Sequence, residues 1–395
     1  MMDALFYLTS LAIIMVIGIL CTIFSEKIKM PNVLLLVIAG IIIGHVDYNG
    51  NPLINFSPLF LTSVGTLALV MIIFDSSSRL KLKEFDTFSM KALKLAGIFL
   101  LLNLIFLTAS VIFIFNINNM FLAMMFAALM SGTAPDIVLT MLKNTKNRVV
   151  ELLKIESILN TPLIVLIPFI ILDLFNDYGE GLFFSKFMET MGPFLQQFVT
   201  GIGAGILVGI VVFKIMRTKY SESLSPLALI TTALITYILA ENLKGNGVLA
   251  VTTVGLFFGN VYVREKETLH EFSSLFANSL EIIVFILVGI IIKFPLDIWF
   301  FAKSMLLFII YLVIRYISVQ LCFSKLNYSV KEKLFMALNV SKGIAVAVVV
   351  FILATYDIPG IEPILNLILA FIIYSIILST IVVKLSKKFL GEEAI

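Results

Sequence analysis

The 395-residue chain has few of the residues that cover soluble proteins. Only 13% of its residues are charged, 60% are hydrophobic, and its mean hydropathy is +1.10. A soluble globule of this length would need far more polar side-chain surface than these residues provide. The net charge of +3 is too small to indicate nucleic-acid binding. The composition therefore predicts a membrane protein.

Residues and motifs of common enzymes are also scarce. Cys21 and Cys322 lie in apolar runs, which favours buried thiols over a disulfide or metal ligands. His45 and His270 are isolated, and a zinc site would need more ligands. The chain has no P-loop, G-x-G-x-x-G, H-E-x-x-H or Ser/His/Asp set. We expect no enzyme activity, no cofactor and no resident metal.

Apolar blocks of membrane-spanning length recur along the chain. Each is long enough to cross about 30 Å of hydrocarbon as a helix, and the alternation typical of a transmembrane barrel is absent. The pattern predicts an all-α polytopic membrane protein with about thirteen transmembrane helices. Their expected ranges are 4–24, 31–46, 58–76, 92–115, 119–143, 149–174, 193–216, 225–240, 247–262, 271–293, 297–322, 332–355 and 361–384.

Basic residues set the expected orientation. Lys and Arg collect in every second connection, whereas the connections between them hold only Lys186, Lys244, Lys293 and Lys303. Because such residues stay on the cytoplasmic side, we expect an outside N-terminus and a cytoplasmic C-terminus in the cell membrane. The first span lacks a basic n-region and a cleavage site, so we expect it to be retained. We expect one transmembrane domain, 1–395, without a soluble domain.

A short similarity suggests two inverted six-helix repeats. AGIIIGHV from Ala39 and VGLFFGNV from Val254 share a G-x-x-x-G core in the second and ninth spans. The repeats would cover about 4–174 and 225–384, joined by a linking helix at 193–216, a common plan in secondary transporters. Alternatively, these small residues merely pack helices together.

Five ionisable residues fall inside predicted spans. A charge near mid-bilayer costs at least about 3 kcal/mol, so such residues usually face a cavity or a partner. They are Asp136, Glu156, Glu281, Arg315 and Lys342. Glu156 begins a polar stripe on one side of the sixth span, continued by Ser157, Asn160 and Thr161. We predict that Glu156 and Lys342 form a structural ion pair.

Two predicted spans are interrupted. In the fifth, Gly132 lowers helix propensity and Pro135 removes a backbone donor, so the helix should unwind there. Freed carbonyls can coordinate a cation, and Asp136 would cap the second half-helix; a plain proline kink is the alternative. In the twelfth, Asn339, Ser341, Lys342 and Gly343 break the apolar run. Two such breaks in corresponding places indicate a transporter's binding site.

These patterns resemble the cation–proton antiporters of the NhaP and NHE type over essentially the whole chain. The similar segments are MPNVLLLVIAGIIIG at 30–44, T-x-P at 133–135, I-E-S-I-L-N at 155–160, IRYISV at 314–319 and KEKLFMALNVSKG at 331–343. The resemblance implies an NhaA-like fold with crossed broken helices and a membrane homodimer. It also implies alternating access for a cation and protons, and it suits an archaeal NhaP-like branch.

The chain departs from that family at its acids. The resemblance implies E-S-x-x-N-D in the sixth helix and T-D-P in the fifth, but Thr161 and Ala134 replace the two aspartates. Lys342 stands where the family has arginine, and Glu281 resembles an acid of the NHE branch. A threonine can donate an oxygen to sodium but does not titrate.

We therefore hypothesise that Asp136 binds the ion, with Glu156 as the second candidate. Neutral oxygens would come from Thr133, Ser157, Asn160 and Thr161. The expected function is exchange of H⁺ for Na⁺, or for Li⁺ or K⁺. An uncoupled or passive cation pathway is the alternative, because Thr161 replaces the usual acid; an ion sensor is a third possibility.

Overall fold

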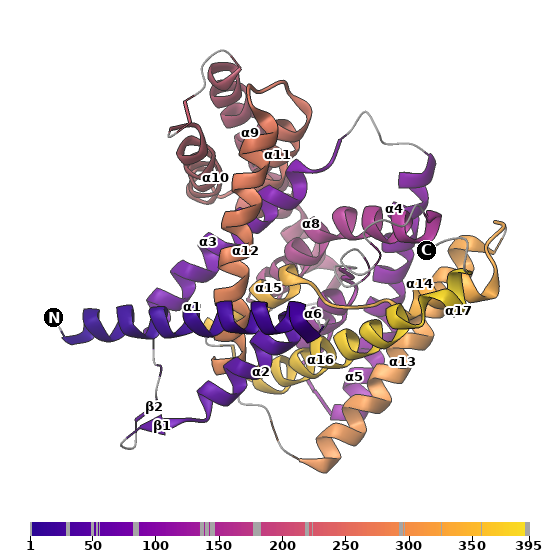
Figure 1. Ribbon diagram of the computed structural model, residues 1–395. Coiled ribbons are helices and arrows are strands. Elements are labelled where there is room, and N and C mark those ends of the chain that lie inside the picture. Colours follow the sequence, from indigo (N-terminus) through magenta and orange to yellow (C-terminus); the bar gives the residue numbers. More distant parts are fainter. Residues whose placement is uncertain are drawn as a thin grey trace.

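The regular elements in the described part of the computed structural model are helices and one small hairpin (Figure 1). The structure describes residues 2–28, 32–48, 51–52, 54, 56–81, 87–134, 138, 142, 147–176, 183–217, 221–222, 224–291, 295, 297–324, 326–356 and 358–391. The hairpin pairs β1 (Asp47–Tyr48) with β2 (Asn51–Pro52) in antiparallel fashion. The helices up to residue 216 are α1 (Met2–Ile28), α2 (Asn32–Gly44), α3 (Pro58–Ser78), α4 (Thr87–Leu102), η2 (Asn103–Leu107), α5 (Thr108–Phe115), α6 (Met120–Met130), α8 (Arg148–Asn176) and α9 (Phe183–Met216).

The second half of the chain continues in the same way. Its helices are α10 (Leu224–Asn242), α11 (Gly247–Asn260), α12 (Lys266–Ile291), α13 (Ile298–Phe323), α14 (Val330–Leu338), α15 (Ile344–Thr355), α16 (Glu362–Lys384) and α17 (Ser386–Leu390). Within the described residues, eight helices are long and apolar enough to cross a membrane, and further apolar helices are shorter. The prediction of an all-helical membrane protein is confirmed.

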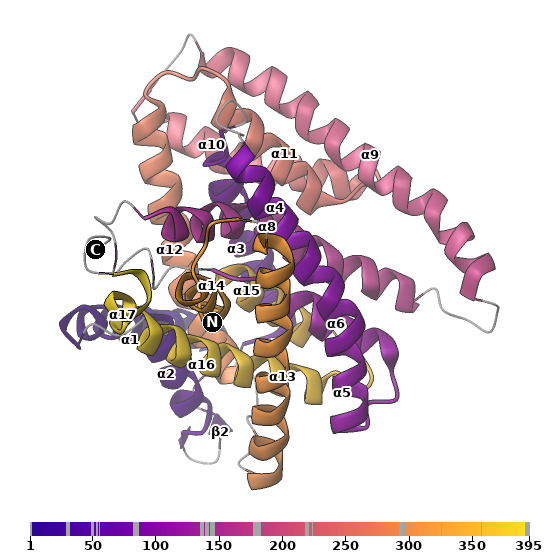
Figure 2. The ribbon, with the colours of Figure 1, turned by 90° about the vertical axis from the view of Figure 1, so that its right-hand side faces the viewer.

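The helices form two groups, which we call the scaffold group and the crossover group. The scaffold group is α1–α3 with α9–α12, in which α2 packs on α12 and α11 packs on α3 and α9. The crossover group is α4–α6, α8 and α13–α16, in which α8 packs on α4 and α6. Figures 1 and 2 show α9, α10 and α11 at one end of the molecule, away from α13, α14 and α16. The two groups meet mainly where α15 packs on α3 and α12.

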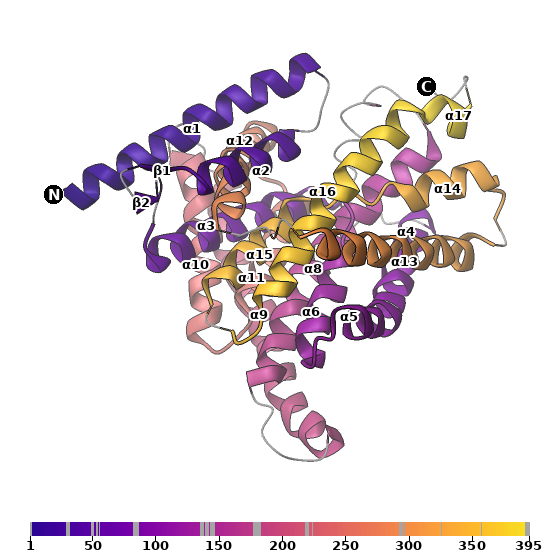
Figure 3. The same ribbon diagram turned by 90° about the horizontal axis from the view of Figure 1, so that it is seen from below.

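Two helices of the crossover group are interrupted. After α6 ends at Met130, residues 132–134 are not helical. Likewise, residues 339–343 separate α14 from α15. Seen from below, α14 and α16 lie together, and α1 and α2 lie beside α12 (Figure 3). The interrupted segments lie in the interior, where Thr133, Ser341 and Lys342 are all buried.

Candidate functional site: the helix crossover

The two interrupted segments are joined directly through their backbones. The Ala134 amide donates to the Ser341 carbonyl at 2.8 Å, and the Ser341 hydroxyl donates to the Ala134 carbonyl at 2.5 Å. The Ser341 amide in turn donates to the Ser379 hydroxyl of α16 at 3.1 Å. Backbone groups released by the loss of helix are therefore satisfied across the crossover, which an apolar interior requires.

Lys342 satisfies further carbonyls at the end of α6. Its Nζ donates to the Met130 carbonyl at 2.6 Å, to the Gly132 carbonyl at 2.7 Å and to the Tyr311 hydroxyl at 2.6 Å. The sequence suggested the carbonyls freed by the break as cation ligands. In the structure, these carbonyls accept hydrogen bonds from the ammonium group of Lys342. Lys342 also lies 4.6 Å from the centre of the Tyr311 ring, a favourable cation–π position.

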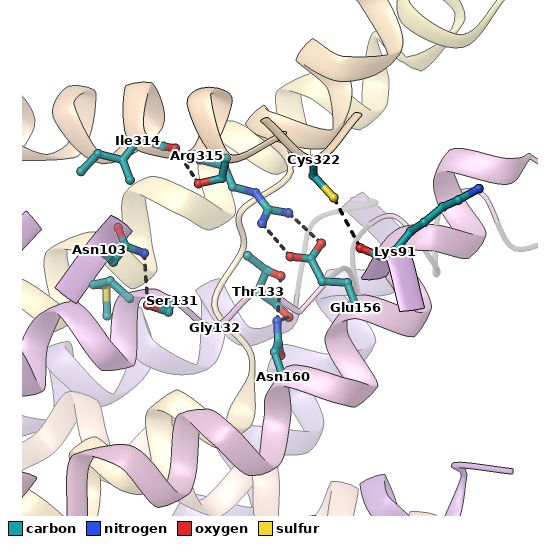
Figure 4. A network of polar contacts seen from close by, with 12 residues as sticks. Lys91, Asn103, Ser131, Gly132, Thr133, Glu156, Asn160, Ile314, Arg315 and Cys322 are labelled. Atoms are coloured by element: carbon teal, nitrogen blue, oxygen red, sulfur yellow. Dashed lines mark hydrogen bonds and ion pairs between the residues drawn. The ribbon is translucent and has the colours of Figure 1, made fainter. Parts of the chain in front are cut away.

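Glu156 pairs with Arg315 and not with Lys342. The Arg315 guanidinium of α13 donates to both carboxylate oxygens of Glu156, at 2.6 and 2.7 Å, and neither residue is exposed (Figure 4). Arg315 also stacks 4.7 Å from the Phe99 ring centre. The predicted Glu156–Lys342 pair is wrong, because the planar guanidinium matches a carboxylate at two points.

Asn160 and Thr133 connect α8 to the interrupted segment. The Asn160 side-chain amide donates to the Thr133 hydroxyl at 3.1 Å and to its carbonyl at 3.4 Å (Figure 4). Asn160 is 3% exposed, and within the described part of the chain its Oδ1 atom has no hydrogen-bond partner. A buried amide oxygen left in this way is an acceptor suited to a cation or to water.

Asn103 belongs to the same region, although no sequence pattern singled it out. It opens the π-helical turn η2 and donates to the Ser131 hydroxyl at 3.1 Å. π-helical turns inside α-helices frequently occur at functional sites. The hydroxyl of Ser131 donates to the Ala127 carbonyl at 2.9 Å. Asn103 therefore fixes the end of α6 next to the break.

A cavity of about 300 Å³, here called the crossover cavity, opens between the two helix groups and ends at the crossover. The scaffold group contributes Asp75 of α3, Arg79 directly after the end of α3, and Glu281 of α12. The crossover group contributes mainly backbone and small side chains, among them Gly132, Thr133, Ala134, Ser157 and Gly343. Of the predicted ligands, Thr133 and Ser157 line this cavity, which therefore borders the interrupted segment.

Asp75 and Arg79 are cavity residues that the sequence analysis missed. Arg79 donates to the Asp75 carboxylate at 3.0 Å, and the Ser274 hydroxyl of α12 donates to the other Asp75 oxygen at 2.9 Å. Their i, i+4 spacing was visible in the sequence. Because both residues lie at the end of a predicted span, however, Arg79 looks like one more basic residue of a cytoplasmic connection.

A second cavity, of about 840 Å³, lies toward the opposite end of α3 and is here called the distal cavity. Thr66 and Leu69 of α3 and Ile352 and Thr355 of α15 line it. The crossover cavity is lined by Ile72 and Asp75 of α3 and by Ala345 and Val346 of α15. Both cavities thus follow the seam between α3 and α15, on opposite sides of a short apolar stretch.

Two predicted site residues and one side chain lie outside the described residues. Pro135 and Asp136 are not described, and neither is the side chain of Thr161, whose backbone lies in α8. The structure brings together Thr133, Asn160, Ser341 and Lys342, and it places the Glu156–Arg315 pair beside them. Glu281 lines the crossover cavity.

Interrupted helices that meet at buried charges, with cavities between two helix groups, are the architecture of secondary transporters. The chain belongs to the sodium/hydrogen exchanger family, whose transmembrane profile matches residues 11–386. This is a family of transporters and not of enzymes, as the sequence predicted, and the antiporter resemblance is confirmed.

Individual relatives are distant. The chain is 25% identical over 373 residues to Na(+)/H(+) antiporter 1 of Methanocaldococcus jannaschii, covering 88% of this chain and 83% of that protein. It is 24% identical over 293 residues to the K(+)/H(+) antiporter NhaP2 of Shewanella sp. (strain MR-4), covering 73% of this chain but only 50% of that protein. The solved structure of the sodium proton antiporter MjNhaP1 from M. jannaschii at pH 8 shares the fold, with a TM-score of 0.79 at 20% identity, covering 99% of this chain and 100% of that chain.

Proposed function

We propose that the protein is a secondary antiporter that exchanges protons for a monovalent cation by alternating access. Na⁺ is the favoured cation, with Li⁺ and K⁺ as alternatives. The observation that carries the proposal is that the crossover cavity ends on the interrupted segment 132–134, between Ser157 and Gly343. The distal cavity on the other side of the α3–α15 seam would give access from the second face of the membrane.

Oxygen atoms near Thr133 suit a hard cation. Neutral ligands would come from the Thr133 and Ser157 hydroxyls and from the Asn160 Oδ1 atom, which has no hydrogen-bond partner among the described residues. Thr161 is a further candidate. Hard cations prefer such ligands, and no resident metal or cofactor is needed for this exchange.

The charges at the crossover require one more acid. Glu156 is matched by Arg315, which leaves the positive charge of Lys342 as an excess among these three groups. A cation enters a positive, low-dielectric site only if a carboxylate compensates it. Asp136 is therefore proposed as the group that binds either the cation or a proton, a competition that antiport at a single site requires.

The names of the relatives support antiport, but they do not agree on a single cation. Their names specify Na⁺ in M. jannaschii and K⁺ in Shewanella. The number and spacing of ligand oxygens determine such selectivity. An uncoupled cation pathway is the second candidate, because Thr161 replaces an acid that the resemblance implies.

We also propose thirteen spans in two inverted repeats, with the N-terminus outside and a homodimeric assembly. Reciprocal packing supports the repeats: α2 packs on α12 as α11 packs on α3, and α1 packs on α12 as α10 packs on α3. In the proposed repeats α1, α2 and α3 correspond to α10, α11 and α12, so exchanging each helix for its counterpart converts the first contact of each pair into the second. Gly40 meets α12 closely, and Gly255 meets α3 closely, so both G-x-x-x-G segments have the same role.

Transport by purified protein in liposomes tests the proposal. A Na⁺ gradient is imposed while membrane voltage is clamped, and internal pH is followed with a dye; Li⁺ and K⁺ replace Na⁺ in parallel. Antiport predicts proton movement against the direction of the cation. Cation flux without proton movement would instead favour the uncoupled pathway.

A further inference from the structure

Lys342 occupies a site with the properties of a monovalent-cation site. An ammonium group has three N–H donors, and Lys342 directs them to three oxygens: two backbone carbonyls and the phenol of Tyr311. All three distances lie between 2.6 and 2.7 Å, and Lys342 is 2% exposed. Neutral oxygens that replace a hydration shell are also how proteins hold alkali cations.

We propose that the carbonyls of Met130 and Gly132 and the Tyr311 hydroxyl form a binding site for a monovalent cation, which the Lys342 side chain fills permanently. The ligand class is a small monovalent cation, either an alkali ion or ammonium. This site goes beyond the proposed transport function, and it does not depend on whether the chain exchanges ions.

Electrostatics explains why a cation belongs there. Met130 is the last residue of α6, so its carbonyl lies at the negative end of the helix dipole. Among the described residues, no carboxylate forms an ion pair with Lys342; the described ion pairs are Arg79–Asp75, Arg148–Glu332 and Arg315–Glu156. Carbonyl dipoles and the Tyr311 ring are therefore the direct contacts that stabilise this buried charge, and the Glu156 carboxylate, which is paired with Arg315, attracts it from farther away.

The site is accessible once the lysine is removed. Gly132, which provides one of the carbonyls, and Gly343, which follows Lys342, both line the crossover cavity. Shortening Lys342 would leave two carbonyls and a hydroxyl in the interior without the donor that they have now, which destabilises the folded protein. An ion that enters from the cavity would remove that destabilisation.

One consequence for transport rests on the proposed function. Because the carbonyls of Met130 and Gly132 are occupied, the transported ion must bind on the other side of the interrupted segment, where Thr133 and Asn160 lie. Lys342 would then determine where the cation binds by excluding it from the carbonyls.

Chemical rescue of Lys342→Ala tests the site. The melting temperature of the detergent-solubilised variant is measured in KCl, NaCl, NH₄Cl and choline chloride at equal ionic strength. We expect Lys342→Ala to melt below the native protein in choline chloride and to regain most of that loss in ammonium or an alkali salt. The native protein should show no comparable response, because its site is filled.

A matched control excludes a general salt effect. Lys333 is also buried and lies on α14, and Lys333→Ala should not be rescued selectively by small cations. Equal rescue of both variants, or no rescue of Lys342→Ala, would overturn the proposed site. The melting measurement does not depend on transport. If the protein showed no exchange in liposomes, the proposed function would be contradicted, but the proposed cation site would not.

A double-mutant cycle covers the case in which Lys342→Ala does not fold. Tyr311→Phe removes one oxygen of the site, and Lys342→Gln removes the ammonium group while keeping most of the length of the side chain. A shared site predicts that Tyr311→Phe lowers the melting temperature much less in the Lys342→Gln background than in the native protein. Additive losses would contradict direct coordination by Tyr311.

Discussion

At the scale of single residues, burial determines which charged groups matter most. Glu156 and Arg315 are both fully buried and bonded at two points, whereas Arg148 is half-exposed where it meets Glu332. Breaking a buried ion pair leaves a charge without compensation in a low-dielectric interior. Breaking an exposed pair leaves charges that water can solvate.

The two pairs should therefore differ strongly in their contribution to stability. We expect Glu156→Gln to destabilise the protein by about 3–5 kcal/mol, because Arg315 loses its counter-charge. Glu332→Gln should cost at most about 1 kcal/mol, since glutamine still completes the capping box at Ser329. Unfolding of both variants in mixed micelles measures the difference; equal losses would contradict the assignment of Arg315 as the partner.

Glu332 also gives a pH dependence. It lies in the first turn of α14, which is not one of the apolar helices of the described chain, and its partner Arg148 is half-exposed. Burial opposes ionisation of Glu332, but hydrogen bonds from the Ser329 amide and the Arg148 guanidinium outweigh burial and hold its pKa below the usual range. A lowered pKa in the folded state stabilises the protein above the usual glutamate pKa, and this contribution is lost as pH falls through the lower value. Melting temperatures between pH about 6 and about 3.5 should fall more steeply for the native protein than for Glu332→Gln.

Sequence reasoning at this scale found the buried charges but paired them incorrectly. Charged residues are rare in apolar spans, and this indicated that Glu156, Arg315 and Lys342 lie in the interior. The choice of partner depends on where α13 passes α8, and that packing leaves no periodic signal in either helix. Tyr311 was missed for the same reason, because an aromatic residue in a span usually packs without a polar role.

At the scale of helices, close backbone contacts hold the scaffold group together. A Cβ atom on Gly289 would lie 2.5 Å from the Val37 carbonyl and 2.8 Å from the Gly40 Cα of α2. Backbone atoms do not yield as flexible side chains do. Small residues at such crossings are the usual means of close helix packing in membranes.

Two glycine substitutions should distinguish the effect of helix–helix packing on stability from the effect of helix propensity. We expect Gly289→Leu to force α2 and α12 apart and to lower stability by about 1–3 kcal/mol or more. A Cβ atom on Gly203 of α9 would point into open space, with no packed neighbour within 4 Å, so Gly203→Ala should be neutral or stabilising by up to about 1 kcal/mol. Thermal unfolding of the two variants compares them, and tolerance of Gly289→Leu would contradict the α2–α12 contact.

Hydropathy predicts the ranges of the helices. The interruptions within those ranges are predicted in some helices and not in others. The predicted span 332–355 covers most of α14 and all of α15, whose separation coincides with Asn339, Ser341 and Gly343. The π-helical turn at Asn103–Leu107 lies inside the span predicted at 92–115 and has no glycine or proline to indicate it. The hydrogen bond from Asn103 to Ser131 at the start of this turn joins two different spans, so only the folded structure reveals it.

At the scale of the whole molecule, a short apolar stretch of the seam between α3 and α15 separates the two cavities. Leu69 lines the distal cavity and Ile72 lines the crossover cavity, about one turn apart on α3. A short apolar barrier of this kind suits alternating access, since a small relative movement of the groups would open one cavity as the other closes. The sequence predicted helices and their breaks, but cavities depend on how distant helices meet.

Restoring an acid beside Asn160 should change the coupling of protons to cations. Thr161→Asp places a second titratable carboxylate in α8, one residue after Asn160. With Asp136 still present, we expect more protons to move per cation and the exchange to become sensitive to voltage. Measuring proton flux in liposomes at several clamped voltages tests this, with Thr161→Asn as the uncharged control. A flux independent of voltage in Thr161→Asp would contradict an additional titrating site.

The most direct test of cation–proton exchange concerns Asp136. Proton flux driven by a Na⁺ gradient at clamped voltage is compared between native protein and Asp136→Asn, both reconstituted at equal density. The proposed mechanism predicts that Asp136→Asn abolishes this flux while the variant remains folded. Undiminished flux in Asp136→Asn would show that another group carries the proton and would contradict the mechanism.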